Sequence, residues 1–172
     1  MSFVQQLRAA TAGDHDAVDA AFGGFALDDA DGYRRFLLAH ARALPAVEMA
    51  LTGAADDELP AFRPRTSALA GDLAALGEAV PAPLPFAATG DAARWGALYV
   101  IEGSRLGGQL LARSLPAGMP AAYLSARHLP GEWRTLLAAL DARAAAADAV
   151  WRETAMAGAR DTFALYARAA AG

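Results

Sequence analysis

A helix-like stretch in the middle of the chain carries three glycines, and this feature most constrains how the chain folds. Residues 99–111 read as one apolar helix, yet they include Gly103, Gly107 and Gly108. Each glycine in a helix interior costs about 1 kcal/mol relative to alanine, so three cost roughly 3 kcal/mol, a large share of a small domain's net stability. Gly103 and Gly107 are four residues apart and share one face. We therefore expect a flat, bulky ligand or another helix to press against that bare face.

Composition limits the classes of protein to which the chain could belong. Its 172 residues favour a single domain spanning 1–172. The absence of cysteine excludes disulfides, thiolate metal sites and cysteine nucleophiles. No apolar run is long enough to cross a membrane, and the first residues do not resemble a signal peptide, so we expect a cytoplasmic protein. The net charge of −4 argues against nucleic-acid binding, although all 15 basic residues are arginine.

Hydrophobic periodicity indicates helices and no strands. Apolar residues recur at helical spacing in nearly every segment between prolines and glycines. The predicted helices cover residues 2–21, a span from 28 or 31 to 51, 66–77, a span from 91 to before 116, 132–146 and 148–169. The expected caps are Asp28 or Asp31 for the second helix, Thr66 for the third and Asp91 for the fourth. The fold class is therefore an all-α multi-helix bundle.

The first predicted helix carries a polar face. Arg8, Thr11 and His15 are spaced by three and four residues, so their side chains lie on one side. Arg8 and His15 are roughly 10 Å apart along the axis. A neutral imidazole can ligate haem iron, and an arginine two turns away can pair with a carboxylate of the same ligand. The alternative is that His15 is an ordinary histidine of an amphipathic helix.

Taken together, the two features resemble a known family. Leu7, Arg8, Thr11, His15 and Asp19, followed later by the run from Glu102 to Gly108, resemble the haem oxygenases. The likeness is greatest to the bacterial, biliverdin-producing branch associated with bacteriophytochromes. It continues through residues 131–134 and 159–163. The paired signature is more specific than either half alone.

The resemblance implies a role for individual residues. It makes His15 the proximal ligand of haem iron and Arg8 the partner of a haem propionate. Gly103, Gly107 and Gly108 would form the distal helix, whose bare backbone approaches the haem. Arg134 would add a propionate contact, and Phe163 would help to wall the pocket.

Ser104 departs from the pattern of the animal enzymes, which have an aspartate after the first distal glycine. A serine hydroxyl offers one donor and two acceptor sites and could hold a water molecule, but it supplies no charge. The alternative is a mid-helix hydroxyl bonded to the carbonyl four residues earlier. The sequence therefore leaves open how Ser104 would contribute to the proton network.

The resemblance also implies a reaction and partners. Haem would be substrate and cofactor at once, opened by O2 to biliverdin, carbon monoxide and iron. Electrons would come from an external ferredoxin, flavodoxin or reductase, and a bacteriophytochrome could accept the product. Two alternatives remain: a non-enzymatic haem-binding or haem-sensing protein of the same fold, and a haem-free helical pocket or interaction protein. In the latter, the glycines would be a close helix contact.

The remaining polar residues carry less functional signal. His40 fits a packed helix, and His128 falls in a proline-rich loop where solvation is expected. The three histidines share no metal-ligand spacing. The basic groups Arg34-Arg35 and Arg63-Pro64-Arg65 suggest a solvated surface, with reductase docking as the alternative.

Overall fold

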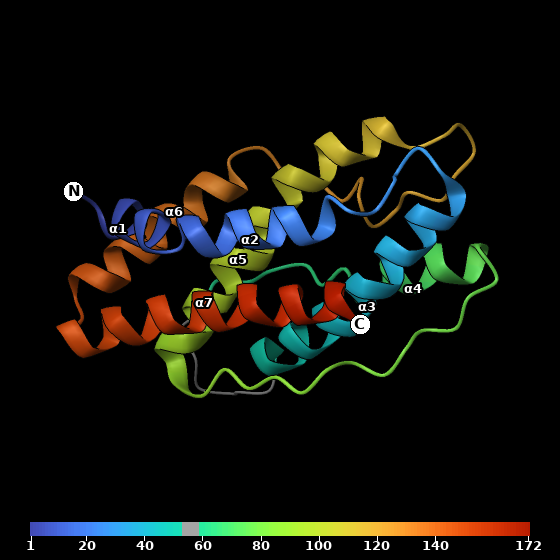
Figure 1. Cartoon of the computed structure of the whole chain (residues 1–172). Coiled ribbons are helices and arrows are strands. Elements are labelled where there is room, and N and C mark those ends of the chain that lie inside the picture. The colour runs from blue at the N-terminus through green and yellow to red at the C-terminus, as the bar shows by residue number, and fades with distance from the viewer. Residues whose placement is uncertain (53–58) are drawn as a thin grey trace.

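The protein is a helical bundle wrapped around one apolar core. The computed structural model describes residues 1–52 and 59–172, and these contain helices and no strand (Figure 1). The α-helices are α1 Phe3–Ala10, α2 Ala12–Phe22, α3 Ala30–Thr52, α4 Thr66–Ala75, α5 Gly90–Leu111, α6 Glu132–Ala145 and α7 Ala149–Ala171, and a short 3-10 helix η1 covers Ala112–Ser114. Buried side chains of α1 and α3–α7 form one continuous cluster.

The first predicted helix is divided in two at Thr11. This residue leaves helical geometry with φ −108° and ψ 5°, and its side-chain Oγ1 donates a hydrogen bond to the Leu7 carbonyl at 2.9 Å. Such back-bonding by threonine bends helices. The sequence missed this interruption because the apolar spacing continues across it. As a result, α2 starts in a new direction and carries no buried residue.

The predicted caps of three helices, α3, α4 and α5, are wrong. Asp29, rather than Asp28 or Asp31, caps α3 by accepting a 2.8 Å hydrogen bond from the Gly32 amide. Thr66 is the first residue of α4, and no side chain of its own segment caps that helix. Instead, the buried carboxylate of Glu48 on α3 accepts hydrogen bonds from the amides of Arg65 and Thr66 at 2.6 and 3.0 Å. A tertiary contact thus replaces a local cap.

Asp91 has a structural role other than the predicted cap. It lies inside the first turn of α5, where its carboxylate accepts hydrogen bonds from the indole nitrogens of Trp95 and Trp151 at 3.1 and 2.7 Å. It also forms a 2.8 Å ion pair with Arg143 on α6. One carboxylate therefore ties α5, α6 and α7 together.

The closest helix contact is between α5 and α7, and two glycines permit it. A Cβ atom added to Gly96 on α5 would overlap the backbone of Ala155 on α7. Similarly, a Cβ atom on Gly158 of α7 would overlap the backbone of Ala93 on α5. The helix-contact interpretation thus applies to Gly96, whereas the alternative of a ligand at the bare face remains for the later glycines.

We predict opposite stability effects for two substitutions on this helix. Gly107→Ala places a methyl group in open space, so the free energy of unfolding of the ligand-free protein should rise by up to about 1 kcal/mol through helix propensity. Gly96→Ala forces the two backbones apart and should lower it by about 3 kcal/mol or more. Urea denaturation followed by circular dichroism measures both. Equal effects of the two substitutions on the free energy of unfolding would contradict the assignment of a helix contact to Gly96 and of open space to Gly107.

Candidate functional site

One large cavity gathers most of the predicted site residues. Its volume is about 620 Å³, within the range of small-molecule pockets, and its walls come from α1, α2, α3, α5, α6 and α7 (Figure 1). The cavity lining includes Arg8, Thr11, His15, Gly103, Ser104, Gly107, Gly108 and Phe163. These residues come from four helices, so only the tertiary fold brings them together.

His15 projects from α2 at the edge of this cavity. Its side chain is 60% exposed, and its Nδ1 atom lies 3.3 Å from the Asp19 carboxylate one turn later. The imidazole meets the Phe163 ring of α7 edge-on, with 5.9 Å between ring centroids. A carboxylate beside one ring nitrogen fixes the orientation of a histidine and leaves its other nitrogen available to a ligand.

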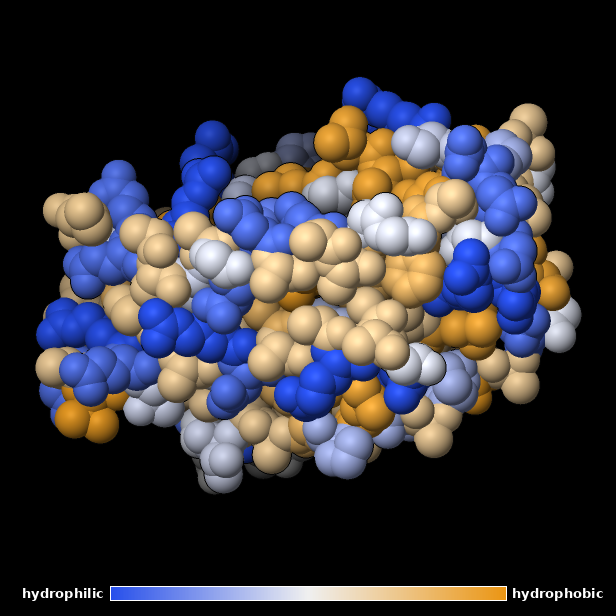
Figure 2. Space-filling model, viewed as in Figure 1, coloured by the Kyte–Doolittle hydropathy of each residue, from blue (hydrophilic) through white to orange (hydrophobic). Residues whose placement is uncertain are grey.

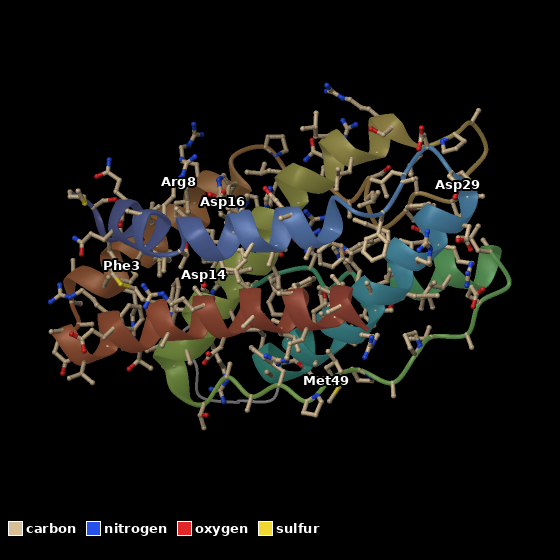
Figure 3. The ribbon with its side chains drawn as sticks, viewed as in Figure 1. Phe3, Arg8, Asp14, Asp16, Asp29 and Met49 are labelled. Carbon is tan, nitrogen blue, oxygen red and sulfur yellow. The ribbon has the colours of Figure 1, made fainter. Side chains whose placement is uncertain are left out.

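Of the two arginines predicted to contact propionates, only Arg8 lines the cavity. Figure 3 shows Arg8 and Asp16 along the same edge of the molecule. Burial raises the pKa of Tyr99 in the cavity wall, and the positive charge of Arg8 counteracts this shift. Arg134 is exposed at the start of α6, near Gly131, and is not among the residues that line the cavity.

The three glycines of the second half of α5 have different surroundings. A Cβ atom on Gly107 would meet no atom within 4 Å, and one on Gly103 would meet only the Trp133 ring, at 3.4 Å. A Cβ atom on Gly108 would lie 3.1 Å from the Leu124 carbonyl oxygen, so this position also permits a close loop contact. The bare face at Gly107 therefore opens into the cavity, whereas Gly103 is covered in part by the Trp133 side chain of α6.

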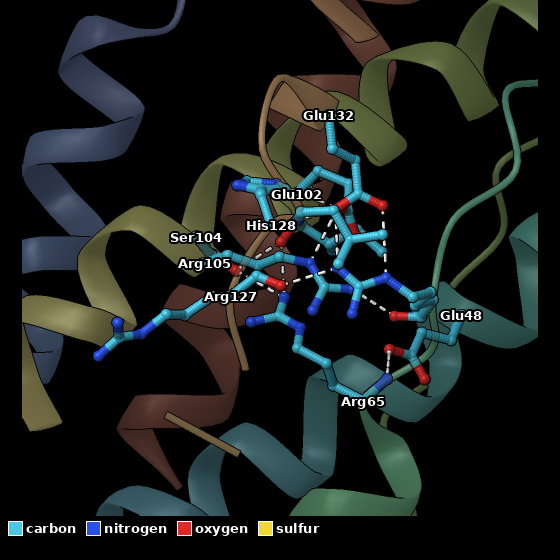
Figure 4. Close-up of polar contacts among 11 residues, drawn as sticks. Glu48, Arg65, Glu102, Ser104, Arg105, Arg127, His128 and Glu132 are labelled. Carbon is cyan, nitrogen blue, oxygen red and sulfur yellow. Dashed lines mark hydrogen bonds and ion pairs between the residues drawn. The ribbon is translucent and has the colours of Figure 1, made fainter. Parts of the chain in front are cut away.

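A buried arginine, missed from the sequence, places positive charge beside Ser104. The Arg65 guanidinium donates hydrogen bonds to the Ser104 hydroxyl at 2.8 Å and to the Ile101 carbonyl at 2.6 Å (Figure 4). Ser104 in turn donates to the Ile101 carbonyl, three residues earlier rather than four. The Nε atom of Arg65 is buried and has no hydrogen-bond partner among the described residues. A buried cation in this state favours a negative charge or a water molecule nearby.

The sequence Arg63-Pro64-Arg65 did not predict that Arg65 is buried, because two arginines around a proline are typical of a solvent-exposed loop. Arg65 is buried and Arg63 pairs with Glu132 at 2.7 Å. The prediction of a solvated surface for the whole group is therefore wrong. Only the fold, through the Glu48 contact with the Arg65 amide, directs this side chain inward.

The deep end of the cavity holds a polar aromatic group. His40 Nδ1 and the Tyr123 hydroxyl share a 2.7 Å hydrogen bond, and the Arg65 guanidinium lies 5.3 Å from the centroid of the Tyr123 ring. Asp72 of α4 fixes this loop by accepting a 2.8 Å hydrogen bond from the Tyr123 amide. Burial, together with the charge of Arg65, lowers the pKa of His40 from its ordinary value of 6.5 to about 3. His40 is therefore neutral at physiological pH. It packs among the aromatic rings of the core, as predicted, and also lines the cavity.

A buried ionic cluster supports the other side of α5. Glu102 lies 2.8 Å from the Arg105 guanidinium and 3.2 Å from His128 Nε2, and His128 stacks on Trp133 with 5.5 Å between centroids. The prediction of a solvated His128 is wrong, because its side chain is only 8% exposed. Glu102 and His128 line a second, smaller cavity of about 300 Å³. Arg105 compensates the carboxylate charge there.

The described residues contain no cluster of His, Asp and Glu side chains suited to a metal ion. Nor does any helix among them combine the length and apolar character needed to cross a bilayer.

Comparison with known proteins identifies the family. No family model matches the chain. A curated haem oxygenase from Xanthomonas campestris pv. campestris (strain 8004) is 39% identical over 151 residues, covering 80% of this chain and 88% of that protein. The chain belongs to the haem oxygenase family. The NO- and CO-bound haem oxygenase from Neisseria meningitidis superimposes with a TM-score of 0.79 at 26% identity, over 99% of this chain and 90% of that one.

Family membership confirms two of the sequence predictions. The all-α haem oxygenase fold is present, and the chain belongs to a family of enzymes. The two non-enzymatic alternatives, a haem sensor and a haem-free helical module, therefore lose support. Haem oxygenases as a family open haem to biliverdin, carbon monoxide and iron.

The partly buried His40 of this haem oxygenase fold should make stability depend on pH. Its pKa is lower in the folded than in the unfolded state, so the unfolded chain binds more protons below about pH 6.5 and the folded state loses stability as pH falls. Between about pH 6.5 and 4.5 the loss should be roughly 2.5 kcal/mol.

His40→Gln keeps a group that can bond Tyr123 but does not titrate, so it should flatten the pH dependence. Urea midpoints of the ligand-free protein at several pH values measure the effect. Since burial also lowers the pKa of His128, a smaller slope of the same sign should persist in this variant. An identical slope in wild type and His40→Gln would show that His40 is not the titrating group.

Proposed function

We propose that this chain binds haem in the 620 Å³ cavity and opens its ring to biliverdin, carbon monoxide and iron. The observation that carries the proposal is the meeting, in one cavity, of an exposed imidazole, an unpaired arginine and a bare helix face. The Xanthomonas campestris relative and the Neisseria meningitidis structural neighbour are both haem oxygenases, which supports the same conclusion.

The residues of the cavity fit a haem. Gly107 leaves space for a flat ligand against the α5 backbone. His15 has a nitrogen free for an axial bond because the carboxylate of Asp19 lies beside the other. Apolar rings such as Phe22, Phe36 and Phe163 complete a lining suited to a porphyrin.

On the proximal side, His15 would be the iron ligand and Asp19 its positioning residue. When bound, haem supplies both the iron that activates O2 and the carbon that is oxidised. An imidazole whose Nδ1 faces a carboxylate is a stronger ligand than a free imidazole. Phe163 would hold the imidazole ring through its edge contact.

The propionates would lie toward Arg8. This arginine lines the cavity mouth and has no ion-pair partner among the residues described. A charge-assisted pair with a carboxylate would therefore replace water at Arg8 without breaking an existing contact. Arg134 would contribute at longer range, since it is exposed beyond Trp133.

On the distal side, Arg65 and Ser104 would act as a unit. The Ser104 hydroxyl accepts from Arg65 and donates to Ile101, which leaves one acceptor site for a water molecule. Arg65 places a positive charge beside this neutral hydroxyl. Preorganised donors in a dry site stabilise negative charge that develops during a reaction.

The chain would depend on an external electron donor such as a ferredoxin, flavodoxin or reductase. Biliverdin could pass to a bacteriophytochrome, as the resemblance to that branch suggests, and the reaction would take place in the cytoplasm. These partners and this location follow from the resemblance and are proposed on that ground.

The ligand assignment predicts a spectroscopic change. His15→Ala should bind hemin with an altered Soret band and form no bilin, because the axial nitrogen is lost. The side chain is exposed, so helical circular dichroism should be unchanged. Added imidazole should restore the wild-type spectrum. His128→Gln, a buried histidine outside this cavity, is the matched control, and a Soret change there but not in His15→Ala would contradict the assignment.

The distal assignment predicts a loss of rate without a loss of binding. In Arg65→Met, single-turnover bilin formation with ascorbate should slow by on the order of 10²-fold, whereas hemin affinity should stay within about threefold. Arg65→Lys should recover part of the rate because it keeps the charge.

Arg63→Met removes an exposed arginine from the same loop and serves as the control, with wild-type rate expected. Thermal melts separate a loss of folding from a loss of rate. Equal turnover in Arg65→Met and Arg63→Met would remove Arg65 from the mechanism.

A further inference from the structure

A second cavity lies beside α5, and the proposed function does not use it. Its volume is about 300 Å³, and its walls come from α5, the start of α6 and the segments 60–62 and 128–131. Figure 2 shows hydrophobic residues over the C-terminal half of α5 seen in Figure 1, where Leu106 and Leu111 line the large cavity. None of the described residues lines both cavities. A ligand in the small cavity would therefore leave the large one free.

Two buried polar side chains in the wall of the small cavity have unused hydrogen-bonding atoms. The side chains of Glu102 and His128 are only 5% and 8% exposed, and they lie next to each other (Figure 4). Glu102 Oε1 and both ring nitrogens of His128 are buried and have no hydrogen-bond partner among the described residues. Buried polar atoms without partners cost free energy, so a ligand that bonds to them would remove this cost.

The unused atoms that remain for a ligand are acceptors. Burial lowers the pKa of His128, so its imidazole is neutral at pH 7 and carries one N–H. The Glu102 carboxylate, 3.2 Å from Nε2, favours the proton on that nitrogen and leaves Nδ1 as an acceptor. Because Arg105 bonds to Glu102 Oε2 at 2.8 Å, Oε1 is the second acceptor. A ligand must therefore bring N–H or O–H donors.

The charged groups around the small cavity are already paired, which favours an uncharged ligand. Glu102 forms an ion pair with Arg105, and Glu132 forms one with Arg63 at 2.7 Å. Glu132 also lies in the first turn of α6, so its carboxylate occupies the positive end of that helix dipole. A charged ligand would lose its hydration here without gaining a new counter-ion among the described lining residues.

The other walls of the small cavity are largely apolar. They include Phe62, Leu98, Pro130 and Leu136. An ordered water molecule needs two to four polar partners, and such walls offer few of them. An apolar ring would therefore fill the space better than a cluster of water molecules.

The segment that carries His128 is fixed on both sides. The Arg127 carbonyl accepts a 2.7 Å hydrogen bond from the Arg63 guanidinium. The Leu129 amide donates a 2.7 Å hydrogen bond to the Glu132 carboxylate. His128 is thus held in place before any ligand arrives, which lowers the entropy cost of binding.

We propose that the small cavity binds an uncharged aromatic carboxamide, that is, a small molecule with N–H donors on an apolar ring. Its N–H groups would donate to Glu102 Oε1 and His128 Nδ1, and its ring would contact Phe62 and the other apolar walls. The Thr135 hydroxyl, which also lines the cavity, would offer a donor to the amide carbonyl. The proposal does not depend on haem binding, because the two cavities share no lining residue.

Benzamide and benzoate are matched probes, since they have the same shape but differ in donors and charge. In a 15N NMR titration of the haem-free protein, benzamide should bind with a Kd of about 1 mM and shift the amide signals of residues 128–132 and of Thr135. Benzoate offers no donor and places a negative charge near Glu102, so its Kd should be at least about tenfold higher. Ligand-observed NMR on the hemin-loaded protein should give the same Kd for benzamide.

Three variants test the location of the site. Thr135→Trp should abolish benzamide binding, because the indole enters the cavity from an exposed position on α6. Ala138→Trp adds the same ring at an exposed position of α6 outside both cavities and is the matched control. His128→Phe keeps a ring to stack on Trp133 but removes Nδ1, so the Kd should rise about fivefold. Thermal melts verify that each variant is folded.

Several results would overturn the proposal. Absence of shifts with benzamide would mean that water alone fills the cavity. Shifts at His15 and Gly107 that vanish on hemin loading would place benzamide in the large cavity instead. Equal affinities for benzamide and benzoate, or equal effects of Thr135→Trp and Ala138→Trp, would also contradict it. A wild-type protein that binds no hemin would reject the proposed function, whereas the titration of the haem-free protein would still decide this proposal.

Discussion

The close crossing of α5 and α7 at Gly96 and Gly158 determines where the cavity can form. Because the two backbones touch there, the first half of α5 is fixed in the core. The second half then extends past the crossing, where Gly107 faces open space and Gly103 meets only the Trp133 ring. Glycine thus serves two purposes on one helix: contact with a helix at Gly96 and clearance for a ligand at Gly107.

The loop before α4 fixes the middle of α5 from the other side. Glu48 holds the Arg65 and Thr66 amides, and the side chain of Arg65 reaches Ser104 and the Ile101 carbonyl. Two residues before Arg65, the Arg63 carbonyl accepts a hydrogen bond from the Arg105 guanidinium. The buried carboxylate of Glu48 therefore sets the geometry of Arg65 and Ser104, although Glu48 itself does not line the cavity. Charged groups buried with specific partners of this kind favour a single arrangement.

Much of this architecture could be predicted from the sequence because it has a local signal. Helical periodicity gives the bundle, and the spacing of Arg8 to His15 and of Gly103 to Gly107 gives two faces that meet in one cavity. Arg65 had no such signal, since its inward direction depends on Glu48, seventeen positions earlier in the chain. The burial of His128 was missed for the same reason: Trp133 and Glu102 cover it from other segments. Local pattern predicts elements and faces, whereas side chains directed by tertiary contacts escape it.

The break at Thr11 separates α2 from α1. None of the α2 residues is buried, and helices with few buried apolar contacts open at low free energy. A protein that converts its bound ligand into an open-chain product must release that product in every cycle. Separation of α2 from α7 would open the cavity while α5, anchored at Gly96, stays in place. In that motion α2, the helix that carries His15, would swing away from the cavity about the helix break at Thr11.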